Sequence, residues 1–117
     1  MIDVYGIPNC DTVKRARTWL DSQGQAYTFH DFKKQGVPET ALARWLAALG
    51  WEPLVNRRGT TWRQLDESAR QAVVDADSAA AALRANPSLV KRPVVEWPGG
   101  AVTVGFDAEV WKARIGH

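Results

Sequence analysis

The sequence has few of the side chains that cross-link a fold or bind a structural metal. Its 117 residues include one cysteine, Cys10, and two histidines, His30 and His117. One cysteine excludes an internal disulfide, and this set offers too few soft ligands for a structural zinc site. A lone thiol is typical of a reducing compartment. We therefore expect no bound metal and no bound cofactor, and the chemical interest falls on Cys10.

Long apolar runs are absent as well. No stretch approaches the roughly 18 residues that a membrane span needs. The N-terminal sequence MIDVYGIPN lacks the basic start and apolar stretch of a signal peptide. We expect a cytoplasmic protein that contacts no membrane, and 117 residues are enough for one domain with a modest core.

The excess of positive charge is small. A net charge of +2 does not predict nucleic-acid binding. The six tryptophans could stack on bases, but three of them lie in amphipathic patterns where packing is the better interpretation: Trp19, Trp45 and Trp111. We expect no direct nucleic-acid partner. The sequence holds three adjacent basic pairs: Lys14-Arg15, Arg57-Arg58 and Lys91-Arg92. Such pairs usually lie on the solvated surface. If the three converged on one cleft, they would instead indicate an anion-binding site.

Hydrophobic periodicity predicts a βαβ unit at the start of the chain. Residues 1–5 alternate as a strand, and residues 26–32 alternate as a second one. Between them, residues 11–23 have the pattern of a helix that Asp11 caps and Gly24 ends. Strands joined in this way are parallel, with a right-handed crossover.

The middle of the chain is predicted to be helical, and the last third to form a hairpin and a short helix. Helices are predicted over residues 38–50, over 60–74 with Thr61 and Gln64 at capping-box spacing, and over 78–87. Asp75 and Asp77 fall at a helix break and are expected to be caps. Residues 92–97 and 101–106 flank a turn and predict a hairpin, after which Asp107 caps a final helix. The order βαβ, helical block, ββ, α indicates a small mixed α/β sheet of four strands.

Cys10 lies between the first strand and the first helix, the part of an α/β sheet where ligands bind. The amides and dipole at a helix N-terminus favour a thiolate, and Lys14 could add a second positive charge. The negative charge of the neighbouring Asp11 disfavours the Cys10 thiolate. The alternative is a buried, inert cysteine, which the loop-forming neighbours of Cys10 disfavour. A protease-like Cys–His pair is disfavoured because His30 falls in a strand and His117 at the end of the chain.

A single nucleophilic thiol needs an external partner to release its product. Glutathione or another protein can supply that thiol. Glutathione carries two carboxylates and arsenate is an oxyanion, so either substrate would explain basic side chains gathered near Cys10.

Four segments of the sequence together resemble one family. The segments YGIPNCDTVKRARTWL, NRRGTTWRQL, LVKRPVVEW and VGFD are similar to those of the arsenate-reductase-like family of ArsC, Spx and YffB, and occur in the same order. The similarity is strongest to the YffB branch, described as glutathione-dependent thiol reductases. It implies a single thioredoxin-like domain over residues 1–117, with a four-stranded mixed sheet and a helical insertion at about 36–88.

The resemblance also implies roles for particular residues. Cys10 matches the nucleophile, and Arg92 precedes Pro93, which matches a proline that is usually cis and faces the cysteine. That geometry would turn the Arg92 backbone toward an extended peptide such as glutathione. Lys14 and Arg92, with Arg58 or Arg57, would bind anionic groups.

Two departures from the family separate the possible activities. Lys14 stands where arsenate reductases have an arginine, and Val104-Gly105-Phe106 holds no counterpart of their last-strand arginine. Val13 stands where Spx regulators carry the second cysteine of a CxxC switch. We therefore expect a glutathione-dependent monothiol reductase. The alternatives are an arsenate reductase that uses glutathione or glutaredoxin, and an Spx-like regulator that binds RNA polymerase.

Overall fold

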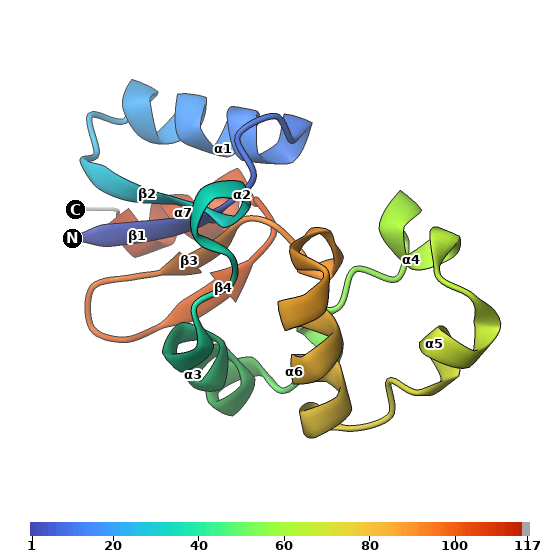
Figure 1. Cartoon of the computed structure of the whole chain (residues 1–117). Helices are drawn as coiled ribbons and strands as arrows, with labels where there is room; N and C mark the ends of the chain where they lie inside the picture. The colour runs from blue at the N-terminus through green and yellow to red at the C-terminus, as the bar shows by residue number, and fades with distance from the viewer. Residues whose placement is uncertain (116–117) are drawn as a thin grey trace. The chain divides into compact units, whose positions relative to one another are not determined.

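Four strands form one mixed sheet in the computed structural model, which describes residues 1–115 (Figure 1). The strand order is β2-β1-β3-β4. β1 and β2 are parallel, with Ile2 opposite Tyr27, while β3 runs antiparallel to both β1 and β4. The predicted βαβ unit and C-terminal hairpin are therefore confirmed. The strands are β1 (Ile2–Gly6), β2 (Tyr27–Asp31), β3 (Val94–Glu96) and β4 (Val102–Val104).

The chain divides into two compact units. The sheet unit comprises Met1–Phe32 and the chain from Arg92 onward, and it holds the strands with α1 (Asp11–Ser22) and α7 (Ala108–Ile115). The helical unit, Lys33–Lys91, contains the segment 36–88 that we predict to be an insertion. Its elements, after the connecting α2 (Phe32–Gln35), are α3 (Glu39–Leu49), η1 (Glu52–Leu54), α4 (Thr60–Gln64), α5 (Glu67–Gln71), α6 (Ala76–Ala85) and η2 (Pro87–Leu89).

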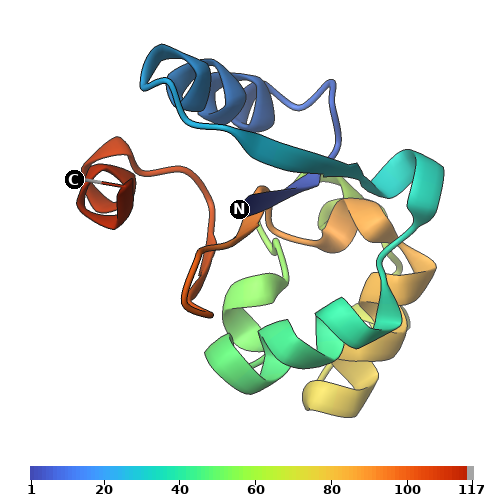
Figure 2. The same ribbon diagram turned by 90° about the vertical axis from the view of Figure 1, so that its left-hand side faces the viewer.

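The core of the sheet unit joins one face of the sheet to α1 and α7. Side chains alternate across a strand, so Ile2 and Val4 share a face of β1. They pack with residues of both helices and of β3 in a buried cluster: Ile2, Val4, Ala16, Leu20, Val95, Trp97 and Trp111. Figure 2 shows α1 in blue and α7 in red beside the sheet. Trp111 is 1% exposed and Trp19 packs against the same cluster, which confirms the predicted packing of these tryptophans.

The start of α1 differs from the prediction. Cys10, not Asp11, is the N-cap, with extended backbone angles (φ −88°, ψ 129°), and Asp11 is already the first helical residue. The Cys10 carbonyl accepts from the Lys14 amide at 2.9 Å, the first bond of the helix. The predicted stop is confirmed, because α1 ends at Ser22 and Gly24 has a φ of 67°.

The helical unit confirms the helix over residues 38–50 but not the one over 60–74. α3 follows an extended Pro38 and ends at Gly50, with Trp45 fully buried. The segment 60–74 forms two short helices, because the Asp66 side chain accepts from the Ala69 amide and caps a new helix.

The predicted caps in the helical unit are partly wrong. The N-cap of α4 is Gly59, without any side-chain cap bond, so Thr61 and Gln64 form no capping box. Asp75 caps α6 in a capping box with Ser78. Asp77 lies inside the first turn of that helix. In the sheet unit, Asp107 accepts from the amides of the first turn of α7, as predicted.

None of the helices within residues 1–115 is long and apolar enough to span a membrane. The second histidine, His117, lies outside the described residues.

Candidate active site

Cys10 lies where the chain leaves β1 and enters α1. The Cys10 amide donates to the Ile7 carbonyl at 3.2 Å, which closes the connecting loop. The thiol is partly buried. Cys10 is the N-cap of α1. The first amides of a helix have no partner within the helix, so they are available to the sulfur.

A glycine allows α1 to begin close to the strand. Gly6 is buried, and a Cβ atom at that position would lie 2.9 Å from Cγ2 of Val13. Val13 is itself fully buried. The close approach of Gly6 and Val13 therefore fixes where the first turn of the helix stands beside β1.

The pKa of the Cys10 thiol is lowered from its ordinary value of 9.0. Partial burial of the sulfur raises the pKa, but four favourable interactions outweigh that cost. The pKa is lowered by the nearby Val13 amide, by the Arg92 side chain through hydrogen bonding and its positive charge, and by the Thr12 amide. The site therefore favours the thiolate, which is the nucleophilic form of cysteine.

Strand pairing explains how Arg92 reaches Cys10 from the far end of the sequence. β3 runs antiparallel to β1 with Val94 opposite Tyr5, so the start of β3 lies beside the end of β1. Arg92 and Pro93 come directly before Val94. The bond between them is cis, as the resemblance implied, and the Pro93 carbonyl accepts from the Gly105 amide at 2.9 Å. Two segments distant in sequence thus supply the sulfur and its cation.

The other predicted anion-binding residues are Lys14, Arg57 and Arg58. Lys14 is exposed. Neither Lys14 nor Asp11 is among the groups that shift the pKa of Cys10. Arg57 and Arg58 belong to the helical unit and are exposed. The Arg57 guanidinium lies over two indole rings, 5.2 Å from the centroid of Trp51 and 6.0 Å from that of Trp62. The anion-binding roles of these residues stay predictions.

His30 has partners of its own on the sheet. Its Nε2 lies 2.9 Å from Oδ1 of Asp3, and its ring stacks on Tyr5 at a centroid distance of 4.3 Å. Within residues 1–115, no three side chains of His, Cys, Asp or Glu gather as a metal site would require.

Sequence reasoning located the sulfur but not all of its partners. The Thr12 and Val13 amides were expected only as part of a helix N-terminus. A cavity along α1 was not expected either, because its lining includes Phe106, which meets Trp19 only through tertiary packing.

With this geometry in place, comparison with known proteins identifies the family. The pattern of the ArsC family matches residues 5–114. The chain belongs to the ArsC family. Its sheet and helices are those of the thioredoxin-like structures in that family, which confirms the fold that the resemblance implied.

Similar proteins cover nearly the whole chain. A solved structure named YFFB is 45% identical, covers 97% of this chain and 98% of its own, and superposes with a TM-score of 0.91. An arsenate reductase (ArsC) related protein from Brucella melitensis is 48% identical over 97% of this chain and 93% of its own, with a TM-score of 0.74. An uncharacterised protein of Haemophilus influenzae is 41% identical over 98% of this chain and 99% of its own.

A more distant relative is a regulator. The global transcriptional regulator Spx of Streptococcus mutans is 22% identical over 98% of this chain and 83% of its own length. The chain is thus similar both to proteins named for reductase chemistry and to one named for transcriptional control.

Proposed function

We propose that this ArsC-family chain is a glutathione-dependent monothiol reductase with Cys10 as nucleophile. The observation that carries the proposal is the hydrogen bond and charge of Arg92 on a thiol whose pKa is lowered. An inert cysteine needs neither a cation nor two helix amides. A nucleophile benefits from both, because they favour the thiolate, which is the reactive form of cysteine.

The proposed reaction is a pair of thiol–disulfide exchanges. The Cys10 thiolate attacks the glutathione sulfur of a mixed disulfide between glutathione and a second thiol, and that thiol leaves as a thiolate and takes up a proton. A glutathione thiolate then attacks the glutathione sulfur bound to Cys10, which forms oxidised glutathione and releases the Cys10 thiolate. The substrate disulfide is reduced by one molecule of glutathione, and the enzyme returns unchanged. Glutaredoxin could take the place of glutathione in the second step.

The cations near the sulfur suit glutathione, which carries two carboxylates. Arg92 adjoins the sulfur, and Lys14 lies one helical turn beyond Cys10. We assign Lys14, Arg92 and one arginine of the helical unit, Arg58 or its neighbour Arg57, to the carboxylates. The segment at Pro93 would lie along the tripeptide backbone.

The test is a single turnover followed by mass spectrometry. When the protein is mixed with oxidised glutathione, Cys10 should gain one glutathione, and added reduced glutathione should remove it. The Cys10→Ser variant should gain none. In an NMR titration of that variant with the S-methyl derivative of glutathione, signals of Lys14 and Arg92 should move. If wild-type Cys10 gains no glutathione, and the titration moves no signals near these residues, the proposal is wrong.

Arsenate reduction is the second candidate, and the 48% identity to an ArsC related protein favours it. It is weakened by Lys14 and by the absence of an arginine in Val104-Gly105-Phe106, since a planar guanidinium binds oxyanions with two parallel hydrogen bonds and a lysine does not. Turnover of arsenate coupled to glutathione and glutaredoxin, measured as arsenite formed, decides this candidate.

The similarity to Spx supports a third candidate, a regulator that binds RNA polymerase. Such a protein would be captured by purified polymerase whether or not Cys10 is intact. Pull-downs with wild-type protein and with Cys10→Ser therefore separate binding from thiol chemistry.

A further inference from the structure

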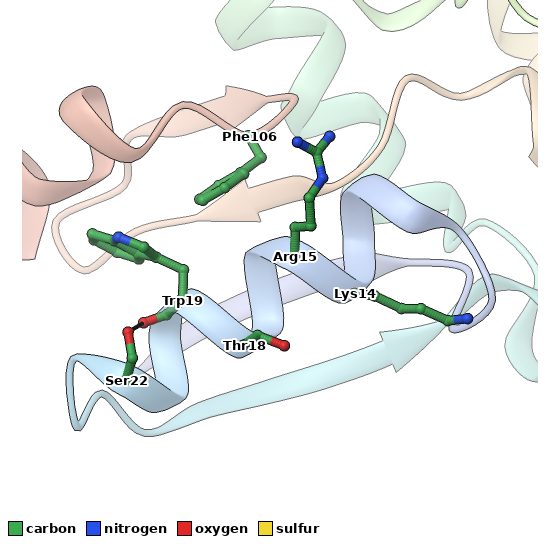
Figure 3. A pocket seen from close by; sticks show the side chains of 6 residues that line it. All are labelled: Lys14, Arg15, Thr18, Trp19, Ser22 and Phe106. Carbon is green, nitrogen blue, oxygen red and sulfur yellow. Dashed lines mark hydrogen bonds between the residues drawn. The ribbon is translucent and has the colours of Figure 1, made fainter.

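A cavity of about 400 Å³ lies along α1 on the sheet unit. This volume is within the range of small-molecule sites. Its lining comes from α1 and from the segment between β4 and α7, and comprises Lys14, Arg15, Thr18, Trp19, Ser22 and Phe106 (Figure 3). Neither Cys10 nor Arg92 belongs to this lining. The cavity is therefore a feature separate from the sulfur and the arginine of the candidate active site.

Two aromatic rings form the apolar wall of the cavity, and the core holds both in place. Trp19 and Phe106 are half-buried, and their ring centroids are 6.1 Å apart. Each ring also contacts the Trp111 ring edge to face, with centroid distances of 6.1 Å from Trp19 and 4.9 Å from Phe106. Because Trp111 is 1% exposed, this wall is anchored to the core of the unit. A flat apolar ligand would bind against rings that are already positioned.

One cation lies beside this wall. Figure 3 shows the Arg15 side chain extending from α1 toward the segment that carries Phe106, whereas the Lys14 side chain extends away from both rings. The aliphatic stem of Arg15 adds apolar surface to the cavity, while its charged end can reach solvent. The cavity thus combines an aromatic surface with one guanidinium.

No carboxylate of the described part of the chain neutralises this guanidinium. Two carboxylates are close to the cavity in sequence: Asp11, four residues before Arg15, and Asp107, next to Phe106. Within residues 1–115, neither of them forms an ion pair with Arg15. Asp107 instead accepts from amides in the first turn of α7. Arg15 donates to Oγ1 of Thr12 at 3.4 Å, which is long for a hydrogen bond. The positive charge of Arg15 is therefore available to an anionic group of a ligand.

We propose that this cavity binds a small planar aromatic carboxylate. The aromatic group lies against Trp19 and Phe106, and the carboxylate accepts two parallel hydrogen bonds from the guanidinium of Arg15. A planar guanidinium matches the geometry of a planar carboxylate in this way. The inference goes beyond the proposed function by assigning a second ligand site to the chain. It does not involve Cys10 or glutathione, so it stands or falls apart from the reductase chemistry.

The first test is an NMR titration of the full chain with 2-naphthoate as the probe. Naphthoate should move the Trp19 indole signal and the amide signals of Thr18 and Phe106. The uncharged 2-naphthamide should bind about two- to fivefold more weakly, because it lacks the charge that pairs with an exposed arginine. Acetate, which has the charge without the ring, should move none of these signals at the same concentrations. Equal binding of naphthoate and naphthamide, or no movement with naphthoate, overturns the proposal.

An arginine variant tests the partner of the carboxylate. Arg15→Gln removes the positive charge and keeps part of the aliphatic stem, so naphthoate should bind to it only as tightly as naphthamide does. Naphthamide itself should bind to Arg15→Gln about as well as to the wild type, which isolates the pairing of charges. Arg114→Gln, at an exposed arginine of α7 outside the lining, is the control and should change neither affinity. Equal loss of naphthoate binding in the two variants, or no loss in Arg15→Gln, refutes the role of Arg15.

Two further variants locate the ring on α1. Thr18 and Asp21 are both exposed on this helix, but only Thr18 lines the cavity. Thr18→Trp should fill the cavity and weaken the binding of naphthoate and naphthamide at least tenfold, while Asp21→Trp should not weaken it. Circular dichroism and thermal unfolding check that both variants fold. Equal binding by the two variants places the ligand elsewhere and refutes the proposal.

Discussion

The Arg92 side chain lowers the pKa of the Cys10 thiol, both through hydrogen bonding and through its positive charge. The two residues are distant in sequence and meet because β3 pairs with β1. Arg92 is partly buried, so its charge is screened less than that of an arginine fully in solvent. The Cys10 thiolate is therefore favoured by a cation that the fold supplies, in addition to the amides of its own helix.

Removing this cation should make Cys10 a weaker nucleophile. In Arg92→Met the hydrogen bond and the charge are lost, so the pKa of Cys10 should rise toward its ordinary value. The rate of alkylation by iodoacetamide at neutral pH should fall by roughly tenfold. The measurement is the alkylation rate as a function of pH, whose midpoint should lie below 9.0 in the wild type and should move upward in the variant. Arg114→Met, at an exposed arginine of α7, is the control. Identical profiles for both variants would contradict the role of Arg92.

Adding a methyl group at Gly6 should disturb the site through Val13. A Cβ atom there would lie 2.9 Å from Cγ2 of Val13, whose amide helps to lower the pKa of Cys10. Gly6→Ala should lower the free energy of unfolding by about 1–3 kcal/mol, as overpacking does, and should raise the pKa of Cys10. Urea unfolding and the alkylation profile measure the two effects.

The double variant tests the cause. Val13→Ala makes room for the added methyl group, so Gly6→Ala should cost less in the Val13→Ala background than in the wild type. Strictly additive costs would show that the two side chains do not collide.

Truncation of Trp111 should destabilise the sheet unit and loosen the cavity wall. Trp111 is nearly fully buried and contacts Trp19, Trp97 and Phe106. Trp111→Ala should cost about 3–5 kcal/mol in urea unfolding. Val110→Ala removes a side chain that is 45% exposed on the same helix and should cost far less. Comparable losses in the two variants would mean that the aromatic cluster does not support the fold.

The lowered pKa of Cys10 should make stability depend on pH. A group whose pKa is lower in the folded state than in the unfolded state stabilises the fold fully above its unfolded pKa, and this contribution is lost as pH falls through the folded pKa. The free energy of unfolding of the wild type relative to Cys10→Ala should therefore increase as pH rises through the folded pKa toward 9.0, and level off above it. Urea unfolding of both proteins across this range measures the difference. A constant difference would indicate that the thiolate is not stabilised by folding.

Much of the fold could be predicted because local patterns decide it. Alternation along β1 and β2, the turn Pro98-Gly99-Gly100 and the cap at Asp107 each leave a signal in a few adjacent residues. The break between α4 and α5 does not, because Asp66 fits a continuous helix about as well as an interrupted one. The helix is interrupted because the Asp66 side chain accepts a hydrogen bond from the Ala69 amide and so caps α5.

The candidate site was predictable to a different extent for each residue. Cys10 stood out from its loop-forming neighbours, and Arg92 from the family resemblance. The limited effect of Lys14 could not be predicted, because its position one turn beyond Cys10 says nothing of where a flexible side chain extends. The cavity wall also has no local signal, since Trp19 and Phe106 meet only through tertiary packing.

During synthesis, Cys10 leaves the ribosome long before Arg92 is translated. Until β3 adds to the sheet, the thiol lacks the hydrogen bonding and the positive charge of Arg92. The part of the lowered pKa that Arg92 supplies therefore arises only once β3 has paired with β1.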